Sequence, residues 1–384
     1  MSVTAAEGFV ASGCHAGIKR RRFDMAMIAT ADRQPVTCAA VFTQNKFAAP
    51  PVELDRETLR TNGGRAAAII INSGNANAGT GKAGMRDARV MSAAAAHALH
   101  IDVSNVLVCS TGIIGTPLPM EPILNATPKL AGKLSADGAE DAARGILTTD
   151  HKAKQIVIRG SSFAVGGMAK GCGMIAPNMA TMLAVLTTDA AVGRAHLQLS
   201  LSAAVRDSFN RIVVDGCTST NDTVLLLASG AAGAPSDLVA FDAAVAEVCL
   251  SLATQMSRDA EGHTKVVRIE IAGAASDAEA DVAARKLATS LLVKCSFYGE
   301  DPYWGRILSD LGTAGIALDT DAITVAYDGV VVAKGLAPTG ADASAVAKQS
   351  EYTLRCDLGV GKGTAWVLTN DLTHAYVDEN MGTS

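Results

Sequence analysis

The sequence predicts a mixed α/β fold, and two observations point to this class. Short apolar runs alternate along the chain with longer segments whose apolar residues recur at helical spacing. The chain also has 384 residues and a hydrophobic content of 49%. It can therefore bury a large core, and its length favours two or more structural units.

Composition and charge narrow the function classes. The formal net charge is -5, which gives no electrostatic reason to expect nucleic acid or a membrane surface as the partner. We interpret the single basic run, Lys19 to Arg22, as a solvated loop or strand end. No apolar secretory segment precedes it, so we expect a cytoplasmic protein. The cysteines are widely spaced without zinc-site patterns, so we expect them to be reduced and mostly buried.

The N-terminal part predicts strands that end in polar loops. Residues 66–71 predict a buried strand. It leads into NSGNANAGTG, residues 72–81, which could surround an anion or a carbonyl with N–H groups, or could be an ordinary turn. A helix is predicted over 85–99, and a strand over 106–110 ends in Thr111-Gly112.

The elements farther along the chain follow the same alternation. A hairpin is predicted from 155–159 and 163–168, and it leads directly into Lys170. The residues Ser276 and Glu279 form a capping-box pattern that predicts a helix start. Helices are predicted over 194–210, 238–256, 276–291 and 341–349, and strands over 323–332 and 364–372.

The segment 170–189, KGCGMIAPNMATMLAVLTTD, has no charged residue between its first and last positions. Glycines, a proline and an asparagine lie just ahead of Ala180 and Thr181, where the segment becomes strand-like. This pattern predicts a backbone with a special geometry and a hydroxyl residue at the first position of the strand. For an isolated threonine, β-propensity alone would be a sufficient explanation.

The string GMIAPNMATML resembles the self-cleavage segment of the ornithine acetyltransferase family, the ArgJ-type enzymes of arginine biosynthesis. The resemblance implies that the precursor cuts itself between Ala180 and Thr181, and that the new N-terminal Thr181 is the acyl-accepting nucleophile. A threonine hydroxyl is a weak nucleophile without a base, and a freed Thr181 would carry its own α-amine as that base. This amine has a reference pKa of roughly 7.7–8.0, so much of it is neutral near physiological pH.

A candidate oxyanion hole follows the predicted strand 106–110. Thr111 and Gly112 can direct one hydroxyl and one backbone N–H to a common point, which is the minimum that an oxyanion hole requires. Without other evidence, the same residues would be an ordinary strand-to-turn transition. The string STGIIG resembles the family's STGVIG, whose Thr and Gly stabilise the tetrahedral oxyanion, so the resemblance implies this role for Thr111 and Gly112.

The resemblance also implies substrate-binding residues upstream of the proposed cut. ILTTD resembles the family's MTTD string, where the second Thr contacts substrate, and this residue is Thr149. Lys170 is expected to anchor a substrate carboxylate, with a surface lysine as the alternative. Thr181 is itself expected to contact substrate as well as to act as the nucleophile.

Further substrate-binding residues are implied toward the C-terminus. SRDAEGHTK resembles the family's DGEG segment and places Glu261 on a glycine-containing turn, where a carboxylate suits the ammonium group of ornithine or glutamate. Asn380 and Ser384 match the family's C-terminal substrate contacts, although the segment after Asn380 is about one residue shorter than usual. Two more strings resemble the family: FNRIVVDGCTSTNDTVLLL, residues 209–227, and LVKCSFYGEDPYWGRI, residues 292–307.

The resemblance covers nearly the whole chain and implies a layered α/β sandwich of the self-processing ornithine acetyltransferase/aminopeptidase type. Cleavage would give an α chain, residues 1–180, and a β chain, residues 181–384, whose strands share sheets. The implied assembly is a heterotetramer of two α and two β chains. The implied reaction moves an acetyl group from N-acetylornithine to glutamate, and acetyl-CoA is an additional possible donor. No metal or other cofactor is expected.

Two alternative functions remain open at this point. A self-activated amidase or aminopeptidase would use the same N-terminal threonine and pass the acyl group to water. A non-enzymatic binding protein would keep the Ala180–Thr181 bond intact.

Overall fold

The chain divides into two compact units. The structure, a computed structural model, describes residues 2–176 and 182–381. Of the described residues, the first unit contains those up to Asn210 together with Cys217–Met256, and the second contains Arg211–Gly216 and those from Ser257 to Met381. The prediction of two or more structural units is therefore confirmed.

Two sheets form the centre of the first unit. The four-stranded sheet has the order β1-β2-β5-β6, and the six-stranded sheet has the order β4-β3-β11-β9-β8-β7. The strands of the smaller sheet are β1 (Phe9–Cys14), β2 (Met25–Thr30), β5 (Ala68–Asn75) and β6 (Val106–Ile113). Those of the larger sheet are β4 (Arg65–Ala66), β3 (Val36–Phe42), β11 (Thr223–Gly233), β9 (Leu183–Ala190), β8 (Ala164–Lys170) and β7 (Lys154–Arg159).

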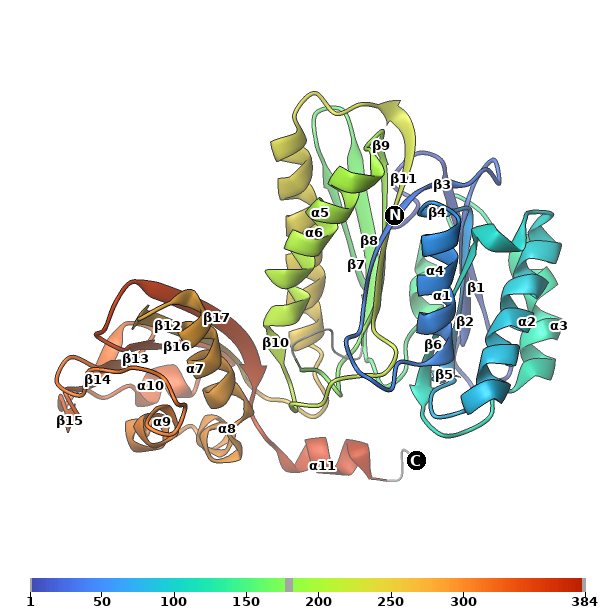
Figure 1. Cartoon of the computed structure of the whole chain (residues 1–384). Coiled ribbons are helices and arrows are strands. Elements are labelled where there is room, and N and C mark those ends of the chain that lie inside the picture. Colours follow the sequence, from blue (N-terminus) through green and yellow to red (C-terminus); the bar gives the residue numbers. More distant parts are fainter. Residues whose placement is uncertain (1, 177–181, 382–384) are drawn as a thin grey trace. The chain divides into compact units, whose positions relative to one another are not determined.

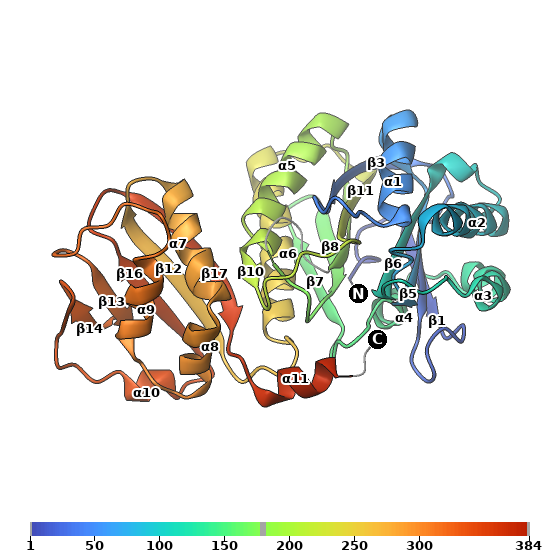
Figure 2. The ribbon, with the colours of Figure 1, turned by 60° about the horizontal axis from the view of Figure 1, so that its bottom comes forward.

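Helices cover the outer faces of both sheets, so the first unit is a layered sandwich (Figures 1 and 2). Helices α2 and α3 lie against the smaller sheet, while α5 and α6 lie against the larger one. The helices of this unit are α1 (Pro50–Thr61), α2 (Gly81–Leu99), α3 (Met120–Gly132), α4 (Ala139–Gly145), α5 (Arg194–Arg206) and α6 (Leu238–Ser257).

The strand β2 shows why this sandwich forms. Every residue of its sequence MAMIAT is buried, as expected for a strand covered on both faces. Ala26 and Ile28 belong to the core between the two sheets, whereas Met25 and Met27 belong to the core under α2 and α3. Successive side chains of a strand point to opposite faces, so one apolar run supplies both cores.

The larger sheet contains strands from both sides of the Ala180–Thr181 bond. The predicted hairpin is confirmed as β7 and β8, with Gly160 N donating to Phe163 O at 2.9 Å. Strand β8 then pairs antiparallel with β9, which places Lys170 opposite Leu183, and β9 pairs parallel with β11. The prediction that the two parts of the chain share a sheet is confirmed.

Helix α6 is the one helix among the described residues that is long and apolar enough, by length and composition, to cross a membrane. The buried core helix of a soluble protein can meet the same criterion. Here the ring of Phe241 in α6 packs edge-on against the ring of Phe163, with 5.5 Å between the ring centroids. A Cβ at Gly167 of β8 would lie 2.9 Å from Val248, so this helix packs closely on the sheet.

The second unit is built on one seven-stranded sheet with the order β10-β17-β12-β16-β13-β14-β15. The strands are β10 (Ile212–Val213), β17 (Gly363–Asn370), β12 (Val266–Ala274), β16 (Glu351–Asp357), β13 (Thr324–Tyr327), β14 (Val330–Lys334) and β15 (Ala337–Pro338). The helices are α7 (Asp277–Thr289), α8 (Leu291–Tyr298), α9 (Trp304–Leu311), α10 (Ser344–Ala347) and α11 (His374–Asn380).

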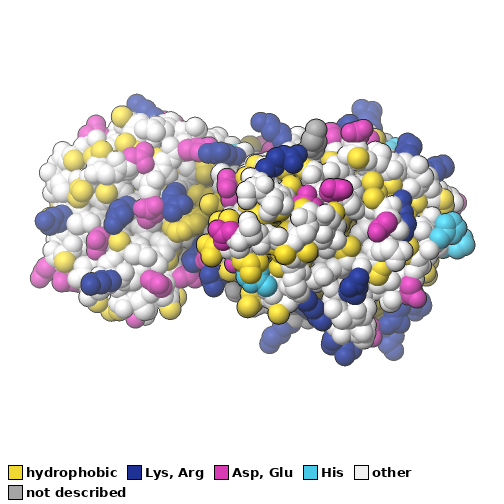
Figure 3. Space-filling view, turned by 90° about the horizontal axis from the view of Figure 1, so that it is seen from above, with side chains coloured by type: hydrophobic (Ala, Val, Ile, Leu, Met, Phe, Trp, Pro, Cys, Tyr) yellow, Lys and Arg dark blue, Asp and Glu magenta, His cyan; other side chains and the backbone are white. Residues whose placement is uncertain are grey.

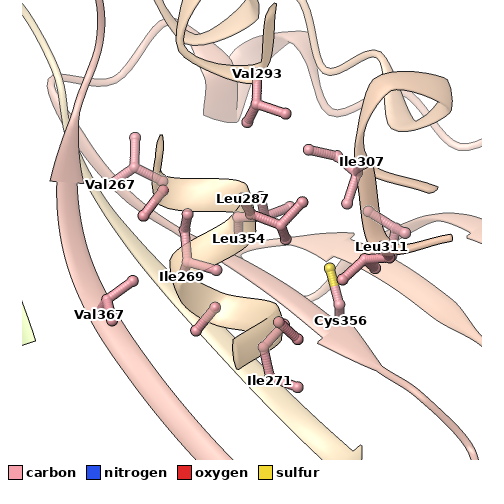
Figure 4. Packing of buried hydrophobic residues seen from close by; sticks show 14 of the residues in the cluster. Val267, Ile269, Ile271, Leu287, Val293, Ile307, Leu311, Leu354, Cys356 and Val367 are labelled. Carbon is pink, nitrogen blue, oxygen red and sulfur yellow. The ribbon is translucent and has the colours of Figure 1, made fainter. Parts of the chain in front are cut away.

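Figure 4 shows the core of this unit. Ile269 of β12 and Leu354 of β16 lie in one buried cluster with Leu287 of α7, and α9 adds Ile307 and Leu311. Burial of each such side chain contributes roughly 1.5–3 kcal/mol. The second unit therefore has its own hydrophobic core.

On the face seen in Figure 3, side chains of both charges are scattered over the surface.

The structure corrects three details of the predicted elements. The region predicted as one strand over 323–332 is two strands, because Asp328 and Gly329 both adopt positive φ and turn the chain. The helix predicted over 341–349 is shortened to Ser344–Ala347. The capping box is half formed: Ser276 Oγ accepts from Glu279 N at 3.2 Å, but Glu279 Oε2 accepts from Ala317 N instead of from the helix start.

Candidate active site

Strand β6 runs from Val106 to Ile113, so Thr111 and Gly112 lie near its end, as predicted, and the strand is longer than the predicted range 106–110. Thr111 is buried, with 2% of its surface exposed. Gly112 has φ +133, and a Cβ there would lie 2.3 Å from the backbone carbon of Gly74. Any side chain at position 112 would collide with β5, so the close approach of the two strand ends requires glycine.

The asparagine-rich segment 72–81, which the sequence predicted as a loop, begins within β5 and is fixed by its own amide groups. Asn72 Nδ2 donates to Asn75 O at 2.8 Å, Asn75 Nδ2 donates to Thr116 O at 3.1 Å, and Asn77 Nδ2 donates to Gly84 O at 2.9 Å. These donors are used inside the protein. The segment therefore supports the end of β6. The sequence suggested that it could surround an anion, but these amide groups bind backbone carbonyls of the protein.

Two consecutive residues, Asn221 and Asp222, connect the end of β6 to the residue after Thr181. Asn221 Nδ2 donates to Ser110 O at 2.9 Å and to Ala76 O at 2.6 Å. Asp222 Oδ1 accepts a hydrogen bond from Met182 N at 2.8 Å. Ser110 precedes Thr111 and Met182 follows Thr181. Two consecutive residues therefore hold the main chain directly before Thr111 and directly after Thr181.

Asp222 is an unusual buried carboxyl. It is completely buried, and its Oδ2 has no hydrogen-bond partner among the residues that the structure describes. Burial raises the pKa of Asp222 well above its usual range, while the Met182 N–H, the Ser219 hydroxyl and the Lys170 charge act in the opposite direction. The Ser219 hydroxyl does not reach Oδ2. In the sequence, Asp222 is followed directly by the apolar run of β11. No lysine or arginine close to it in the sequence suggested that this carboxyl is buried.

A second polar cluster surrounds Asp150 and includes two predicted substrate-binding residues. Asp150 Oδ1 accepts from Lys154 Nζ at 2.7 Å and from Gly171 N at 2.7 Å. Lys170 Nζ lies 3.8 Å from Asp150 Oδ2, too far for a hydrogen bond. Thr149 Oγ1 is 3.0 Å from the sulfur of Cys172.

Charge balance in this cluster favours an ionised Asp150. Burial alone would raise its pKa, but the charges of Lys170 and Lys154 and the hydrogen bonds from Lys154 and Gly171 hold the pKa below its usual value. Two nearly buried ammonium groups therefore share one carboxylate. The surplus positive charge lies at Lys170, where a substrate carboxylate was predicted to bind.

Glu261 and Asn380 meet in the second unit. Asn380 Nδ2 donates to Glu261 Oε2 at 2.9 Å. Thr373 caps helix α11 by accepting from Tyr376 N at 3.1 Å, and its hydroxyl donates to Gly262 O. A Cβ at Gly262 would lie 2.1 Å from Tyr376 N, so glycine allows the helix to pack against the turn that carries Glu261. The predicted glycine-containing turn is confirmed.

Some predicted site residues lie outside the described part of the chain. These residues are Ala180, Thr181 and Ser384. Sequence reasoning missed Asp150, Asn221 and Asp222. The last two belong to the family-like string 209–227, which was the only signal for them, because their contacts are with residues far away in the sequence.

Comparison with known proteins identifies the family of this chain. Residues 10–382 match the family model described as the ArgJ family. The arginine biosynthesis bifunctional protein ArgJ of Thermobifida fusca is 44% identical over 100% of both chains. The chain therefore belongs to the ArgJ family, as the sequence motifs predicted.

Solved structures of relatives were also found. The arginine biosynthesis bifunctional protein ArgJ from Bacillus halodurans is 39% identical, with a TM-score of 0.49, over 51% of this chain and 96% of that chain. The ornithine acetyltransferase from Mycobacterium tuberculosis, solved with ornithine, is 38% identical, with a TM-score of 0.44, over 46% of this chain and 94% of that chain.

Proposed function

We propose that this protein transfers the acetyl group of N-acetylornithine to glutamate through an acetyl ester on Thr181. Family membership supports an acyltransferase of arginine biosynthesis, because the relatives are named for that pathway. The observation that carries the proposal is the bridge made by Asn221 and Asp222, which bind Ser110 O and Met182 N. This bridge supports a common location for the oxyanion donors and the nucleophile.

Self-cleavage would create the catalytic group. Attack of Thr181 Oγ on the Ala180 carbonyl would give an ester that water hydrolyses, leaving an α chain of residues 1–180 and a β chain of residues 181–384. Pairing of β8 with β9 supports continued association of the two chains, because it joins strands from both sides of the bond. Neither chain alone would complete the larger sheet.

The acetyl group then moves in two balanced steps. Thr181 Oγ attacks the acetyl carbon of N-acetylornithine while the α-amine of Thr181 accepts the hydroxyl proton. The Thr111 hydroxyl and the Gly112 N–H stabilise the oxyanion. The C–N bond breaks, and ornithine leaves with the proton. The amine of glutamate attacks the acetyl ester, Thr181 regains its proton, and N-acetylglutamate is released.

Both amino acids carry an α-carboxylate, and Lys170 is the residue that we assign to it. The distance of 3.8 Å from Lys170 Nζ to Asp150 Oδ2 is too long for a hydrogen bond, which supports a substrate carboxylate as a partner of this ammonium group. Thr149 would contact the substrate beside it. Glu261, with Asn380 and Ser384, would bind an ammonium group of the substrate.

The name "bifunctional" in the relatives supports acetyl-CoA as a second donor. Thr181 would take the acetyl group from the thioester, and CoA would leave as the thiol with the proton of the threonine hydroxyl. We further propose that the fragments assemble as a heterotetramer of two α and two β chains in the cytoplasm.

An assay with purified protein tests this function. Acetylornithine plus glutamate should give ornithine and N-acetylglutamate in equal amounts, with little free acetate. Acetyl-CoA plus glutamate, assayed beside it, separates a bifunctional enzyme from one with a single donor. Release of acetate that does not depend on glutamate would instead identify an amidase, and an uncut chain without turnover would identify a binding protein.

A further inference from the structure

A pocket of the first unit is lined by side chains of the basic run that the sequence analysis interpreted as a solvated loop. Arg21 and Arg22 of this run lie in its wall with Arg144 of α4 and His151. The proposed acetyl transfer from acetylornithine does not use these residues. They come from segments far apart in the sequence, so the fold brings the positive charges together.

The pocket has a surplus of positive charge. Its acidic wall residues are Glu140 and Asp150. The carboxylate of Asp150 already lies 2.7 Å from Lys154 Nζ and 3.8 Å from Lys170 Nζ, so its charge is balanced by two lysines. Among the wall residues, Glu140 is then the one carboxylate set against three arginines. The chain as a whole is acidic, with a net charge of -5, so this surplus is local.

The arginines are positioned by contacts that leave charge available for a ligand. Arg22 donates to the backbone carbonyl of Asp150 at 3.2 Å, and that bond does not neutralise it. The Arg144 guanidinium lies over the ring of Phe23, 4.8 Å from its centre, and 3.9 Å from the exposed carboxylate of Asp141. Arg21 is exposed and makes no side-chain hydrogen bond or ion pair to any of the described residues. Planar guanidinium groups bind phosphate oxygens in pairs, so the chemistry selects a phosphorylated ligand.

The pocket borders the candidate active site. Asp150 lines it, and the same residue lies 3.8 Å from Lys170 and accepts a hydrogen bond from Gly171 N. A ligand with phosphates in the pocket and an uncharged arm could extend past Asp150 toward Lys170, to which the substrate carboxylate is assigned. Acetylornithine has no phosphate, whereas the second proposed donor, acetyl-CoA, has phosphates at one end and a thioester at the other.

We propose that the arginine pocket, formed by Arg21, Arg22 and Arg144, binds the phosphate groups of acetyl-CoA. This inference rests on the proposed function, and it assigns a separate binding site to the second donor. The acetyl group would still move from the thioester sulfur to Thr181 Oγ, with the hydroxyl proton leaving on CoA.

Kinetics with two donors and one truncated donor test this site. In Arg21→Ala and Arg144→Ala, loss of a charged hydrogen bond to phosphate should raise the KM for acetyl-CoA about tenfold. The KM for acetylornithine should remain at the wild-type value, which also shows that the variants are folded. Acetyl-pantetheine, which has no nucleotide phosphates, should have the same kcat/KM with the wild type and with both variants.

Arg20→Ala is the matched control, because Arg20 belongs to the same exposed basic run but does not line the pocket. Its acetyl-CoA kinetics should equal those of the wild type. Unchanged acetyl-CoA kinetics in both pocket variants, or an equal loss with acetyl-pantetheine, would overturn the proposal. Absence of CoA binding to the wild-type enzyme in calorimetry would also overturn it. Acetylornithine turnover, measured in the same samples, shows separately whether the proposed function fails.

Discussion

The carboxylate oxygen Oδ1 of Asp222 accepts a hydrogen bond from the backbone N–H of Met182 at 2.8 Å. This N–H belongs to the peptide bond that follows Thr181, so Asp222 anchors the main chain directly after the proposed nucleophile. Asn221 binds Ser110 O in the same way, one residue before Thr111. The end of β6 and the residue before β9 are thus both hydrogen-bonded to the same pair of consecutive residues, Asn221 and Asp222.

Asp222→Ala should slow self-cleavage about tenfold, because loss of one buried hydrogen bond leaves the Met182 N–H unsatisfied and the main chain directly after Thr181 less fixed. Asp222→Asn keeps an acceptor oxygen and should cleave at close to the wild-type rate. The fraction of intact chain on a denaturing gel over time measures both rates. Cleavage of the alanine variant at the wild-type rate would rule out this positioning role.

Thr111→Ala should lower kcat about 10²–10³-fold, the usual loss when one oxyanion donor is removed. The KM for acetylornithine should change much less, because the oxyanion forms only in the transition state. Steady-state kinetics with acetylornithine and glutamate provide the measurement. An effect confined to KM would mean that Thr111 binds the ground state and is not an oxyanion donor.

Lys170→Met should raise the KM for acetylornithine and for glutamate by about tenfold or more, because both lose a charged contact to the α-carboxylate. Asp150 would remain paired with Lys154, at 2.7 Å, so the local fold should persist. Lys334→Met, in strand β14 of the second unit, is a surface control. A KM increase for only one of the two amino acids would contradict a shared carboxylate site.

The buried carboxyl of Asp55 predicts a pH effect on stability. It is completely buried in α1, accepts from Val108 N at 2.9 Å, and has its pKa raised well above the usual value by burial, with that hydrogen bond acting in the opposite direction. A raised pKa in the folded state means that the folded chain binds more protons than the unfolded chain. Asp55 therefore costs stability as pH rises from the unfolded pKa, about 3.9, toward the folded pKa.

Asp55→Asn removes this titration but keeps an acceptor for Val108 N. The melting temperature of the variant minus that of the wild type should become more positive between pH 4 and pH 8, by roughly 2–4 °C for each kcal/mol. Thermal melts of the two proteins at matched pH values measure the trend. A difference that stays constant or falls with rising pH would show that Asp55 is ionised in the folded chain.

The sequence predicted the local elements and part of the site well. Short apolar runs located the hairpin β7–β8 and the strand β6, because such runs depend only on residues close together in the sequence. It did not predict that Gly112 must approach Gly74, or that Asp222 is buried beside Met182. Those contacts join residues that are distant in sequence, and spacing along the chain carries no information about them.

The same limit applies to the basic run. Lys19 to Arg22 resembled an ordinary solvated loop, because the partners that give the run a pocket, Arg144 and His151, lie more than a hundred residues away. Lys19 itself donates to Leu147 O at 2.8 Å, and burial lowers its pKa to about 8, against the opposing charge of Asp24. Only the fold shows which members of the run face solvent.

The central claim is that acetyl-Thr181 forms before glutamate arrives. Enzyme mixed with acetylornithine alone and quenched in acid should contain a β fragment that is heavier by one acetyl group, and peptide mass analysis should locate that group on its N-terminal threonine. Glutamate added before the quench should remove it. Thr181→Ala should remain one uncut chain without the adduct. A β fragment without added mass, in an enzyme that still makes N-acetylglutamate, would contradict the covalent mechanism and the role of Thr181.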